Sequence, residues 1–578
     1  MADHLRLLIL LLSLCTISVL GKVFVSIDCG ASDSFTDENS IVWKGDVDLI
    51  SNGVTHVVHS NYSASHVMDT LRVFTTRKKN CYSIEAEEGG KVLVRASFNY
   101  GNYDQKSNPP IFDLHFDGNF WISVNTSQVK IYEAIYVVKR KVISVCVAQT
   151  RPNNFPFISA LEVRSVDSQV NKYVDTNYAL FMNARVAYAT NETTRFPADS
   201  YDRIWLPSPG GNGLLNMKSD ASVINVGVPN NPPQEVLKHA IMVPNTSQMI
   251  TLGLPTIDYP IRYPLYINWY FSEIQEVNST NIRSFRVLEN GLPFSLAIIP
   301  PFRNVIVYFI SNITVTPNTN FSLDPIGATL PPLINAAEVY SISDALTNGT
   351  NNNDVEGLFS LQKAFDVLQE WGGDPCLPSP YSWEWIDCND DATPRVTSLN
   401  LTGFNLSGPL PDFSKMDALE IIDFHNNSLT GPIPDFIGNL PNLKQLYLAD
   451  NQFSGSIPRS LSTNSNLNLS LTGNPLLCTN AKSCPGNNKN KKQTSKLPVI
   501  LGITIPIFFI VAAIMGFLVI RRNRRMPHTG DMSPNINGPS STQGTMPDGN
   551  VDDQGANKLR GNKEERFYAS PTPLLAEG

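Results

Sequence analysis

The stretch from Leu497 to Ile520 limits the possible folds of this chain more than any other feature. Its 24 residues carry no charge and one hydroxyl group, on Thr504. As an α-helix it would be about 36 Å long, which is enough to cross a hydrocarbon core of about 30 Å with some tilt. A buried helix of a soluble protein would normally have a polar face, and this stretch has none. Together with the arginines that follow from Arg521, this predicts a transmembrane helix over residues 497–520.

The N-terminus decides the orientation of this helix, because lysines also flank its other end and make the local charge comparison nearly equal. Arg6 precedes an apolar run over residues 7–20, and Gly21 follows it as a small residue. This is the pattern of a secretory signal peptide over residues 1–21. We therefore expect a single-pass type I protein of the plasma membrane, with an extracellular N-terminus and residues 521–578 in the cytosol.

Glycosylation sequons and cysteines agree with this topology. Twelve Asn-x-Ser/Thr sequons precede the apolar stretch and none follows it, which is typical of a glycosylated extracellular region. The sequon asparagines are Asn61, Asn125, Asn191, Asn245, Asn278, Asn312, Asn320, Asn348, Asn400, Asn405, Asn426 and Asn468. The seven cysteines after the signal peptide all lie before residue 485, as disulfides in an oxidising compartment would require.

Composition and motifs exclude several function classes. The formal charge of −8 is mild and spread along the chain, which argues against a nucleic-acid partner. The sequence has no Gly-x-Ser-x-Gly, His-Glu-x-x-His or Cys-x-x-Cys motif, and no local pair of carboxylates suited to glycoside hydrolysis. We therefore expect no enzyme activity, no cofactor and no metal site.

Short β-rich runs separated by Gly, Asn and Pro clusters fill two blocks of the chain. In the first block, residues 23–28, 91–98 and 141–148 have this character, and in the second block residues 265–271 and 304–310 do. This pattern predicts antiparallel β-sandwiches, one in each block.

The same blocks contain motifs that resemble the plant malectin-like domain. The first half carries Ser26-Ile-Asp-Cys-Gly-Ala, Asn80-Cys-Tyr-Ser-Ile and Phe98-Asn-Tyr-Gly-Asn-Tyr-Asp, and the second half carries Asp199-Ser-Tyr-Asp-Arg-Ile-Trp and Leu330-Pro-Pro-Leu-Ile-Asn-Ala-Ala-Glu-Val-Tyr. The resemblance covers most of residues 24–342. It implies tandem malectin-like sandwiches, which we place at residues 22–165 and 166–345.

A helix and a short series of repeats follow. Residues 354–371 have helical spacing of apolar side chains, with Asp354 as the expected cap and Gly372-Gly373 as the expected end. The segments Gly373-Asp-Pro-Cys and Trp383-Glu-Trp-Ile-Asp-Cys resemble the N-terminal cap of plant leucine-rich repeat receptors. Glycine and proline then recur every 23 or 24 residues, which predicts about three repeats of a short solenoid. Phe404 stands in the first repeat where later repeats have asparagine.

The expected organisation is therefore mostly β, with a capping helix and N-terminal cap at 346–390, leucine-rich repeats at 391–484, a stalk at 485–496, the transmembrane helix and a disordered tail at 521–578. The resemblance implies a Cys376–Cys388 disulfide in the N-terminal cap and a Cys478–Cys484 disulfide in the C-terminal cap. Cys29, Cys81 and Cys146 remain in the first sandwich, and the sequence does not decide which two of them pair. The third thiol would be free or would bridge two molecules.

The order of these parts resembles the ectodomain of plant receptors of the symbiosis-receptor type, but the kinase motifs of that type are missing. The resemblance implies a receptor-like protein that recognises an extracellular glycan or peptide and signals through a partner kinase. Small residues at Ala512 and Gly516 predict close association of the membrane helix with such a partner or with a second copy. The alternative is an adhesive protein that anchors cell-wall glycans to the membrane without signalling.

Two surfaces are candidates for ligand binding. By resemblance to animal malectin, the aromatic loop with Tyr100, Tyr103 and Asp104, and its counterpart with Tyr270 and Phe271, have residue types that suit a sugar. The concave face of the repeats would present Asn400, Asp423, His425, Gln445 and Tyr447. The alternatives are that the aromatic residues fill the sandwich cores and that the concave face is simply solvated.

Overall fold

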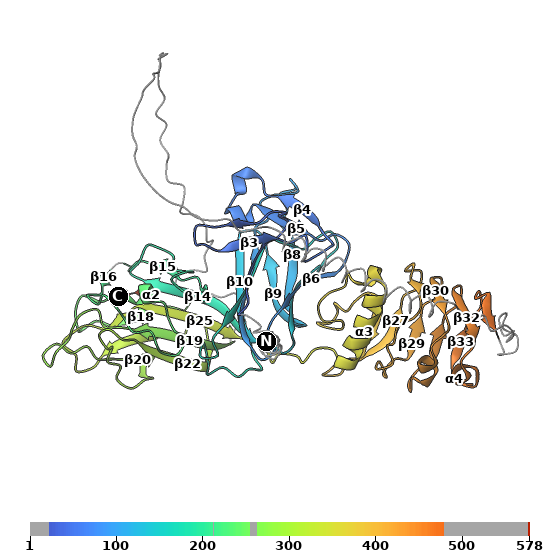
Figure 1. Ribbon diagram of the computed structural model, residues 1–578. Helices are drawn as coiled ribbons and strands as arrows, with labels where there is room; N and C mark the ends of the chain where they lie inside the picture. Colours follow the sequence, from blue (N-terminus) through green and yellow to red (C-terminus); the bar gives the residue numbers. More distant parts are fainter. Residues whose placement is uncertain (1–21, 212, 255–262, 479–575, 578) are drawn as a thin grey trace, which may run out of the picture. The chain divides into compact units, whose positions relative to one another are not determined.

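The computed structural model describes residues 22–211, 213–254, 263–478 and 576–577 (Figure 1). The predicted signal peptide, stalk and transmembrane helix lie outside the described residues, and so does the predicted tail except for residues 576–577. Cys484, Ala512 and Gly516 also lie outside the described residues. Among the described residues, no helix combines the length and the apolar character that a membrane crossing needs.

The first β-sandwich, called sandwich 1 here, is built from strands that bury alternate side chains. In β7 (Lys91–Phe98), Val92, Val94, Ala96 and Phe98 face the core, while Arg95 faces the opposite side. One layer is β6-β11-β8-β9, with bounds Lys79–Glu85, Val142–Ala148, Ile111–Phe116 and Asn119–Asn125. The other layer is β2-β3-β1-β13-β7-β10, with bounds Phe35–Thr36, Val42–Gly45, Phe24–Asp28, Ala160–Val166, Lys91–Phe98 and Lys130–Val137. A small third sheet, β12-β5-β4, and two 3-10 turns complete it, with bounds Phe157–Ile158, Thr70–Val73, Val54–Val57, Ser60–Tyr62 (η1) and His66–Met68 (η2).

The larger layer does not end with sandwich 1. Its strand β10 pairs antiparallel with β14 (Leu180–Tyr188), so that Ala134 lies opposite Phe181 and Ile135 opposite Leu180. The sheet then continues through β25, β19 and β22, with bounds Ala336–Ile342, Tyr263–Phe271 and Ile306–Val315, and β15 (Leu206–Ser208) pairs with β14. One eleven-stranded sheet therefore runs through both predicted sandwiches.

The second sandwich, called sandwich 2 here, packs smaller sheets against the continuation of this large sheet. The first is β21-β20-β23-β18-β35, with bounds Leu292–Pro293, Phe285–Glu289, Phe321–Pro325, Ile250–Leu252 and Ala576–Glu577. The pairing of Ala576–Glu577 with β18 departs from the prediction of a disordered cytosolic tail. The second is β16-β17-β24, with bounds Leu215–Lys218, His239–Met242 and Leu333–Ile334, beside helix α2 (Gln234–Leu237). The core includes Trp269, Phe271, Phe285 and Phe321, all with at most 1% of their surface exposed.

Buried charges join the two sandwiches where β10 meets β14. Arg185 of β14 donates to Glu133 of β10 at 2.6 Å and to Glu338 of β25 at 2.7 Å. Arg95 of β7 donates to the same Glu133 at 2.8 Å. Burial alone would raise the pKa of Glu338, but Arg185 and Arg203 lower it to about 2. The carboxylates therefore stay charged, and each has a cationic partner in the interior.

Helix α3 (Asn352–Ala364) differs from the sequence prediction at both ends. Its N-cap is Asn351, whose side chain accepts from the amide of Asn353, whereas Asp354 lies buried in the first turn. Asp354 is held there by Arg395, at 2.8 Å, and by the amide of Val396, at 2.9 Å, so its carboxylate ties the helix to the first repeat. The predicted continuation to Trp371 is wrong, because Phe365 is extended and a 3-10 turn, η3 (Asp366–Leu368), follows.

The predicted solenoid is present. Its main sheet is β26-β27-β29-β31-β33, with bounds Ile386–Cys388, Val396–Asn400, Ile421–Asp423, Gln445–Tyr447 and Asn468–Ser470. A second sheet, β28-β30-β32-β34, has bounds Ser407–Gly408, Ser428–Gly431, Gln452–Ser456 and Leu476–Cys478, and the short helices η4 (Asp435–Asn439) and α4 (Arg459–Ser462) lie between repeats.

Asparagines connect successive repeats of the solenoid. The amide nitrogen of Asn427 donates to the carbonyl of Leu401 at 2.8 Å, and its oxygen accepts from the amide of Leu406 at 2.9 Å. Asn451 and Asn474 repeat this pattern one and two repeats later. Phe404, which replaces the first asparagine, packs at a ring distance of 6.0 Å from Trp371. The ladder therefore starts on an aromatic contact instead of an amide.

Candidate functional site

The predicted sugar-binding loop of sandwich 1 is mostly occupied by its own contacts. The hydroxyl of Tyr100 donates to Asp104, and 8% of the surface of Tyr100 is exposed. Tyr103 packs with its ring edge against Tyr100 at 5.5 Å and against Phe157 at 6.0 Å. Burial raises the pKa of Tyr100 to about 12, so its hydroxyl stays protonated. The structure brings these three residues together, and a role for them in ligand binding stays a prediction.

The counterpart in sandwich 2 has no accessible surface. Tyr270 and Phe271 are both 0% exposed, and the hydroxyl of Tyr270 donates to the buried carboxylate of Glu338 at 2.5 Å. Tyr270 packs edge-on against Trp205, and Phe271 against Phe285. The conformation described here therefore places both residues in the interior, where they contribute to packing.

The concave face of the repeats brings three of its five predicted residues into one row. Asn400, Asp423 and Tyr447 are register partners on β27, β29 and β31. His425 and Asp423 are joined at 2.6 Å, and the hydroxyl of Tyr447 donates to Gln445 at 2.9 Å. Asp423 and His425, and likewise Gln445 and Tyr447, therefore hydrogen-bond to each other, which leaves fewer donors and acceptors for a ligand.

Sequons frame the concave face at both ends. Asn400 lies on the first parallel strand and Asn468 on the last, and both side chains are exposed. All twelve sequon asparagines are exposed, as glycan attachment would require. Their glycosylation itself stays a prediction.

The structure shows two disulfides and one free cysteine among the described residues. Cys81 and Cys146 form the disulfide of sandwich 1, joining β6 to β11, and Cys29 is free and completely buried. Cys29 therefore has no surface from which to bridge molecules. Cys376 and Cys388 form the disulfide that the receptor resemblance implies. The predicted partner of Cys478 lies outside the described residues.

The segment from α3 to Cys388, called the cap here, packs tightly on sandwich 1. Gly373 has a φ of +72°, and a Cβ on it would lie 2.5 Å from the Sγ atom of Cys81. Lys79 is buried, and its ammonium donates to the carbonyls of Asp374 at 2.7 Å and Leu377 at 2.8 Å. Burial lowers the pKa of Lys79 to about 8. These contacts fix the cap directly against the sandwich disulfide.

Aromatic contacts extend the same interface. The guanidinium of Arg77 lies 3.8 Å from the ring centre of Trp371 and forms an ion pair with Glu370. The ring of His115 lies 5.1 Å from that of Tyr381, whose hydroxyl donates to Asp113 at 3.1 Å. Burial lowers the pKa of His115 to about 3, so this histidine is neutral.

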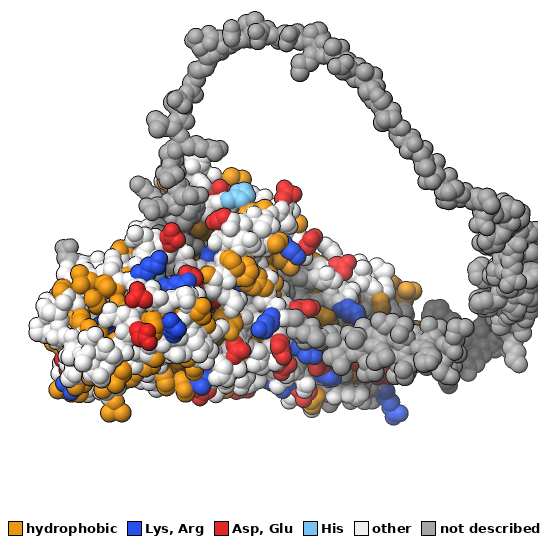
Figure 2. All heavy atoms as spheres, turned by 60° about the vertical axis from the view of Figure 1, so that its left-hand side comes forward, with side chains coloured by type: hydrophobic (Ala, Val, Ile, Leu, Met, Phe, Trp, Pro, Cys, Tyr) orange, Lys and Arg blue, Asp and Glu red, His pale blue; other side chains and the backbone are white. Residues whose placement is uncertain are grey.

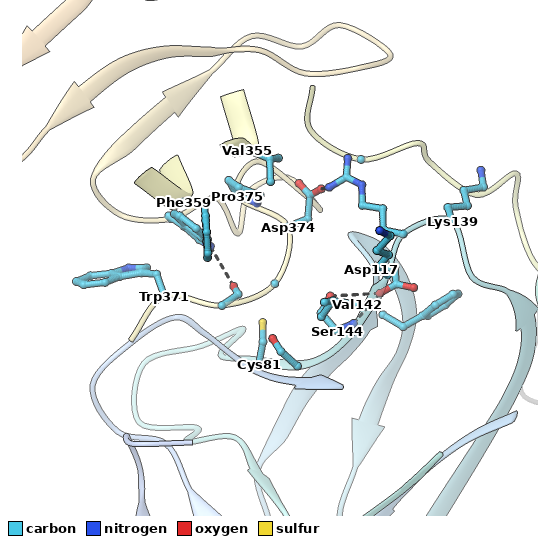
Figure 3. A pocket seen from close by; sticks show the side chains of 18 of the residues that line it. Cys81, Asp117, Lys139, Val142, Ser144, Val355, Phe359, Trp371, Asp374 and Pro375 are labelled. Atoms are coloured by element: carbon cyan, nitrogen blue, oxygen red, sulfur yellow. Dashed lines mark hydrogen bonds and ion pairs between the residues drawn. The ribbon is translucent and has the colours of Figure 1, made fainter. Parts of the chain in front are cut away.

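Beside this interface lies a cavity of about 910 Å³, called the cap cavity here. Figure 3 shows Val355, Phe359 and Trp371 on its cap side and Asp117, Val142 and Ser144 on its sandwich side. The linker around residues 346–349 forms a further part of the wall. A volume in this range is typical of ligand-binding sites.

Most charges around the cap cavity already have partners. Lys139 donates to the carbonyls of Leu346, at 3.0 Å, and Thr347, at 3.3 Å, and Arg140 donates to the carbonyls of Asn348 and Thr350. Asp117 accepts from the amide of Ser144 at 2.6 Å, and burial raises its pKa to about 6. In the part of the chain that the structure describes, no group of three or more His, Cys, Asp or Glu side chains could hold a metal ion.

Comparison with known proteins identifies the fold of the sandwiches. The family profile of the malectin-like domain matches residues 27–342, which is more than half of the chain. The chain belongs to the malectin-like domain family. The leucine-rich repeat profile matches residues 418–440 and 442–464, within the solenoid. The predicted malectin-like fold and the presence of leucine-rich repeats are thus confirmed.

Malectin-like relatives include receptor kinases. The leucine-rich repeat receptor-like serine/threonine-protein kinase IOS1 of Arabidopsis thaliana is 31% identical over 527 residues, which are 87% of this chain and 57% of that kinase. An uncharacterized Arabidopsis thaliana protein is 36% identical over 361 residues, which are 60% of this chain and 70% of that protein. The chain spans 46–62% of the length of the first curated relatives that it matches. Among solved structures, the ANX2 ectodomain from Arabidopsis thaliana has a TM-score of 0.47 and 16% identity, over 56% of this chain and 97% of that one.

The malectin-like region exposes two further features that the sequence interpretation missed. Tyr173 and Phe309 stack in parallel at 4.0 Å beside a small cavity of about 120 Å³ on sandwich 2. The turn after β20 and the segment beyond it expose Leu292, Leu296 and Ile299, and Figure 2 shows apolar side chains gathered over the end formed by sandwich 2. The cap cavity was missed too, since its walls come from residues about 230 positions apart. The only hint of the cap cavity in the sequence was Phe359, an aromatic residue within the predicted helix.

Proposed function

We propose that this chain is a cell-surface receptor-like protein that binds an extracellular ligand in the cap cavity and signals through a kinase-bearing partner. The observation that carries the proposal is the cavity itself, which is formed jointly by a malectin-like sandwich and the cap of the repeats. Its walls are held by the Cys81–Cys146 disulfide on one side and by the Cys376–Cys388 disulfide on the other. A site with fixed walls loses little conformational entropy on binding.

The first experiment asks whether the protein binds an extracellular ligand at this place. Purified full-length protein is applied to an array of plant cell-wall glycans and to a library of dodecapeptides displayed on phage. We expect saturable binding that Phe359→Ala weakens, because Phe359 is 64% exposed and lines the cavity. Absence of saturable binding to both sets, or binding that Phe359→Ala leaves unchanged, would contradict the proposal.

The second experiment concerns the partner. The predicted helix at 497–520 places Ala512 and Gly516 four residues apart, where small side chains let two helices approach closely. We expect co-immunoprecipitation of the full-length protein with a receptor kinase to be lost in Ala512→Leu/Gly516→Leu, with surface expression unchanged. Unchanged association would place the partner contact outside this face. A protein that binds wall glycans and associates with no kinase would be an adhesive anchor instead.

A further inference from the structure

Helix α3 has two apolar sides, and only one of them is covered. Gly357, Leu358 and Leu361 are buried, and a Cβ on Gly357 would lie 2.4 Å from Met416 in the first repeat. Val355, Phe359 and Lys363 follow one another at intervals of four residues, so they share the side that lines the cap cavity. Phe359 is a large aromatic side chain with 64% of its surface exposed there.

The sandwich wall of the cavity repeats this pairing of an apolar side chain with a lysine. Lys141 and Val142 are neighbours at the start of β11, both line the cavity and both are exposed. Leu49 adds a second aliphatic side chain on the same wall, with 44% exposed. Each wall therefore presents an apolar contact beside an ammonium group.

Lys141 and Lys363 differ from the other cations of the cavity in having no partner. The ammonium of Lys139 and the guanidinium of Arg140 are held by linker carbonyls, and Glu370 is paired with Arg77. Within the described ranges, neither Lys141 nor Lys363 has a hydrogen bond or ion pair from its side chain. Two free ammonium groups on a mostly apolar cavity are complementary to a ligand that carries both carboxylates and apolar groups.

We propose that the cap cavity binds an extended acidic peptide segment, with its apolar side chains between Phe359 and Val142 and its carboxylates on Lys141 and Lys363. The inference rests on the function proposed above and names the ligand class for that site. A neutral glycan would leave both ammonium groups without a counter-charge. An oligogalacturonate would also supply carboxylates, but its hydroxyl-rich rings offer less apolar surface to Phe359, Val142 and Leu49 than the aliphatic and aromatic side chains of a peptide do. The apolar walls therefore favour a peptide.

The test selects dodecapeptides from a random phage library on the purified full-length protein and on its Lys141→Glu/Lys363→Glu variant. On the native protein we expect enriched sequences to combine Asp or Glu with Leu, Ile, Val or Phe. On the variant we expect the same apolar positions with Lys or Arg in place of the acids. A native-selected acidic peptide should bind the variant at least about tenfold more weakly, since two charge-assisted contacts become repulsive.

Matched variants separate the cavity from general charge effects. Lys218→Glu reverses an exposed lysine on sandwich 2, and Val367→Ala shortens an exposed side chain of the cap that does not line the cavity. Both should leave peptide affinity unchanged, whereas Phe359→Ala should weaken it. A charge swap in the selected peptides cannot come from misfolding, because an unfolded variant would select no defined sequence.

The outcomes distinguish this inference from the broader function. Enrichment without acidic residues, or affinity that is insensitive to the two lysines, would overturn the acidic-peptide assignment. Binding of trigalacturonate in the absence of peptide enrichment would overturn it too, while receptor function would stand with a sugar ligand. Failure of glycans and peptides alike to bind would contradict both.

Discussion

At the residue scale, Gly373 is the position where the cap depends most closely on the sandwich. Its φ of +72° suits glycine, and its α-carbon faces both sulfur atoms of the Cys81–Cys146 disulfide. A Cβ would lie 2.5 Å from one sulfur and 2.8 Å from the other. Neither sulfur can move away, because the disulfide joins paired strands β6 and β11.

Gly373→Ala should therefore lower the free energy of unfolding by more than backbone strain alone, by about 2–4 kcal/mol. Gly89→Ala is the matched control, since its φ is +80° and nothing lies within 4 Å of the added carbon. That control should cost about 1 kcal/mol. Denaturant unfolding of both variants gives the comparison, and equal losses would show that the cap does not press on the disulfide.

Asp117 gives a residue-scale prediction on pH. Burial raises the pKa of its carboxyl from 3.8 to about 6. Between these values the folded protein binds more protons than the unfolded chain, so this group favours folding at low pH and the benefit is lost as pH rises toward 6. Asp117→Asn keeps an oxygen that can accept from Ser144, and it should raise stability at pH 7 by about 1–3 kcal/mol.

The measurement is the unfolding free energy of native protein and Asp117→Asn at pH 4, 5, 6 and 7. The two curves should converge near pH 4 and separate above pH 6, with the variant more stable. Asp390→Asn, in the exposed loop that follows the cap, controls for the loss of a surface charge. A variant that is less stable than the native protein at pH 7 would show that the ionised carboxylate is needed.

At the element scale, strands β10 and β14 carry the junction between the two sandwiches. Only two residue pairs connect these strands in register, and the charges of Glu133, Arg185 and Glu338 lie beside them in the interior. Removing one partner of a buried pair leaves an uncompensated charge. We therefore expect the stability of the junction to depend strongly on this network.

We expect Arg185→Met to lower the free energy of unfolding by about 3 kcal/mol, because Glu133 and Glu338 each lose a close cation. Arg286→Met is the matched control, since Arg286 pairs with Asp324 at 2.9 Å but is 35% exposed. The control should change stability by less than about 1 kcal/mol. Denaturant unfolding monitored by tryptophan fluorescence measures both, and similar losses would contradict a special role for the junction.

Some of these elements could be predicted from the sequence, and others could not. The repeats were predictable because their glycine and proline period and their asparagines are local patterns, and Asn427 and Asn451 take the expected ladder positions. The cap disulfide followed from a motif resemblance. The end of α3 was not predictable, because Phe365 to Trp371 keeps helical spacing although the chain turns to fill the core of the cap.

The candidate site was less predictable than the fold. Aromatic character pointed to Tyr270 and Phe271, but those residues are buried, since a β-strand that is covered on both faces has the same composition as a binding strand. The cap cavity depends on residues near 50, 140 and 360 meeting in space. No local pattern encodes that meeting, and only the free side of α3 hinted at it.

At the scale of the whole molecule, we propose that the ligand binds between sandwich 1 and the cap, not on the concave face of the repeats. The cap is fixed to sandwich 1 through Lys79, Arg77 and Gly373, so the cavity walls belong to one interface. On the concave face, by contrast, Asp423, His425 and Tyr447 already have hydrogen-bond partners among neighbouring side chains.

Hydrogen–deuterium exchange of the full-length protein, with and without a peptide selected on it, locates the binding site directly. We expect slower exchange in α3 and in the turn at residues 138–142, with exchange in β29 and β31 unchanged. The Lys141→Glu/Lys363→Glu variant should show no slowing with the same peptide. Slower exchange confined to β29, β31 and β33 would contradict binding in the cap cavity and place the ligand on the concave face of the repeats.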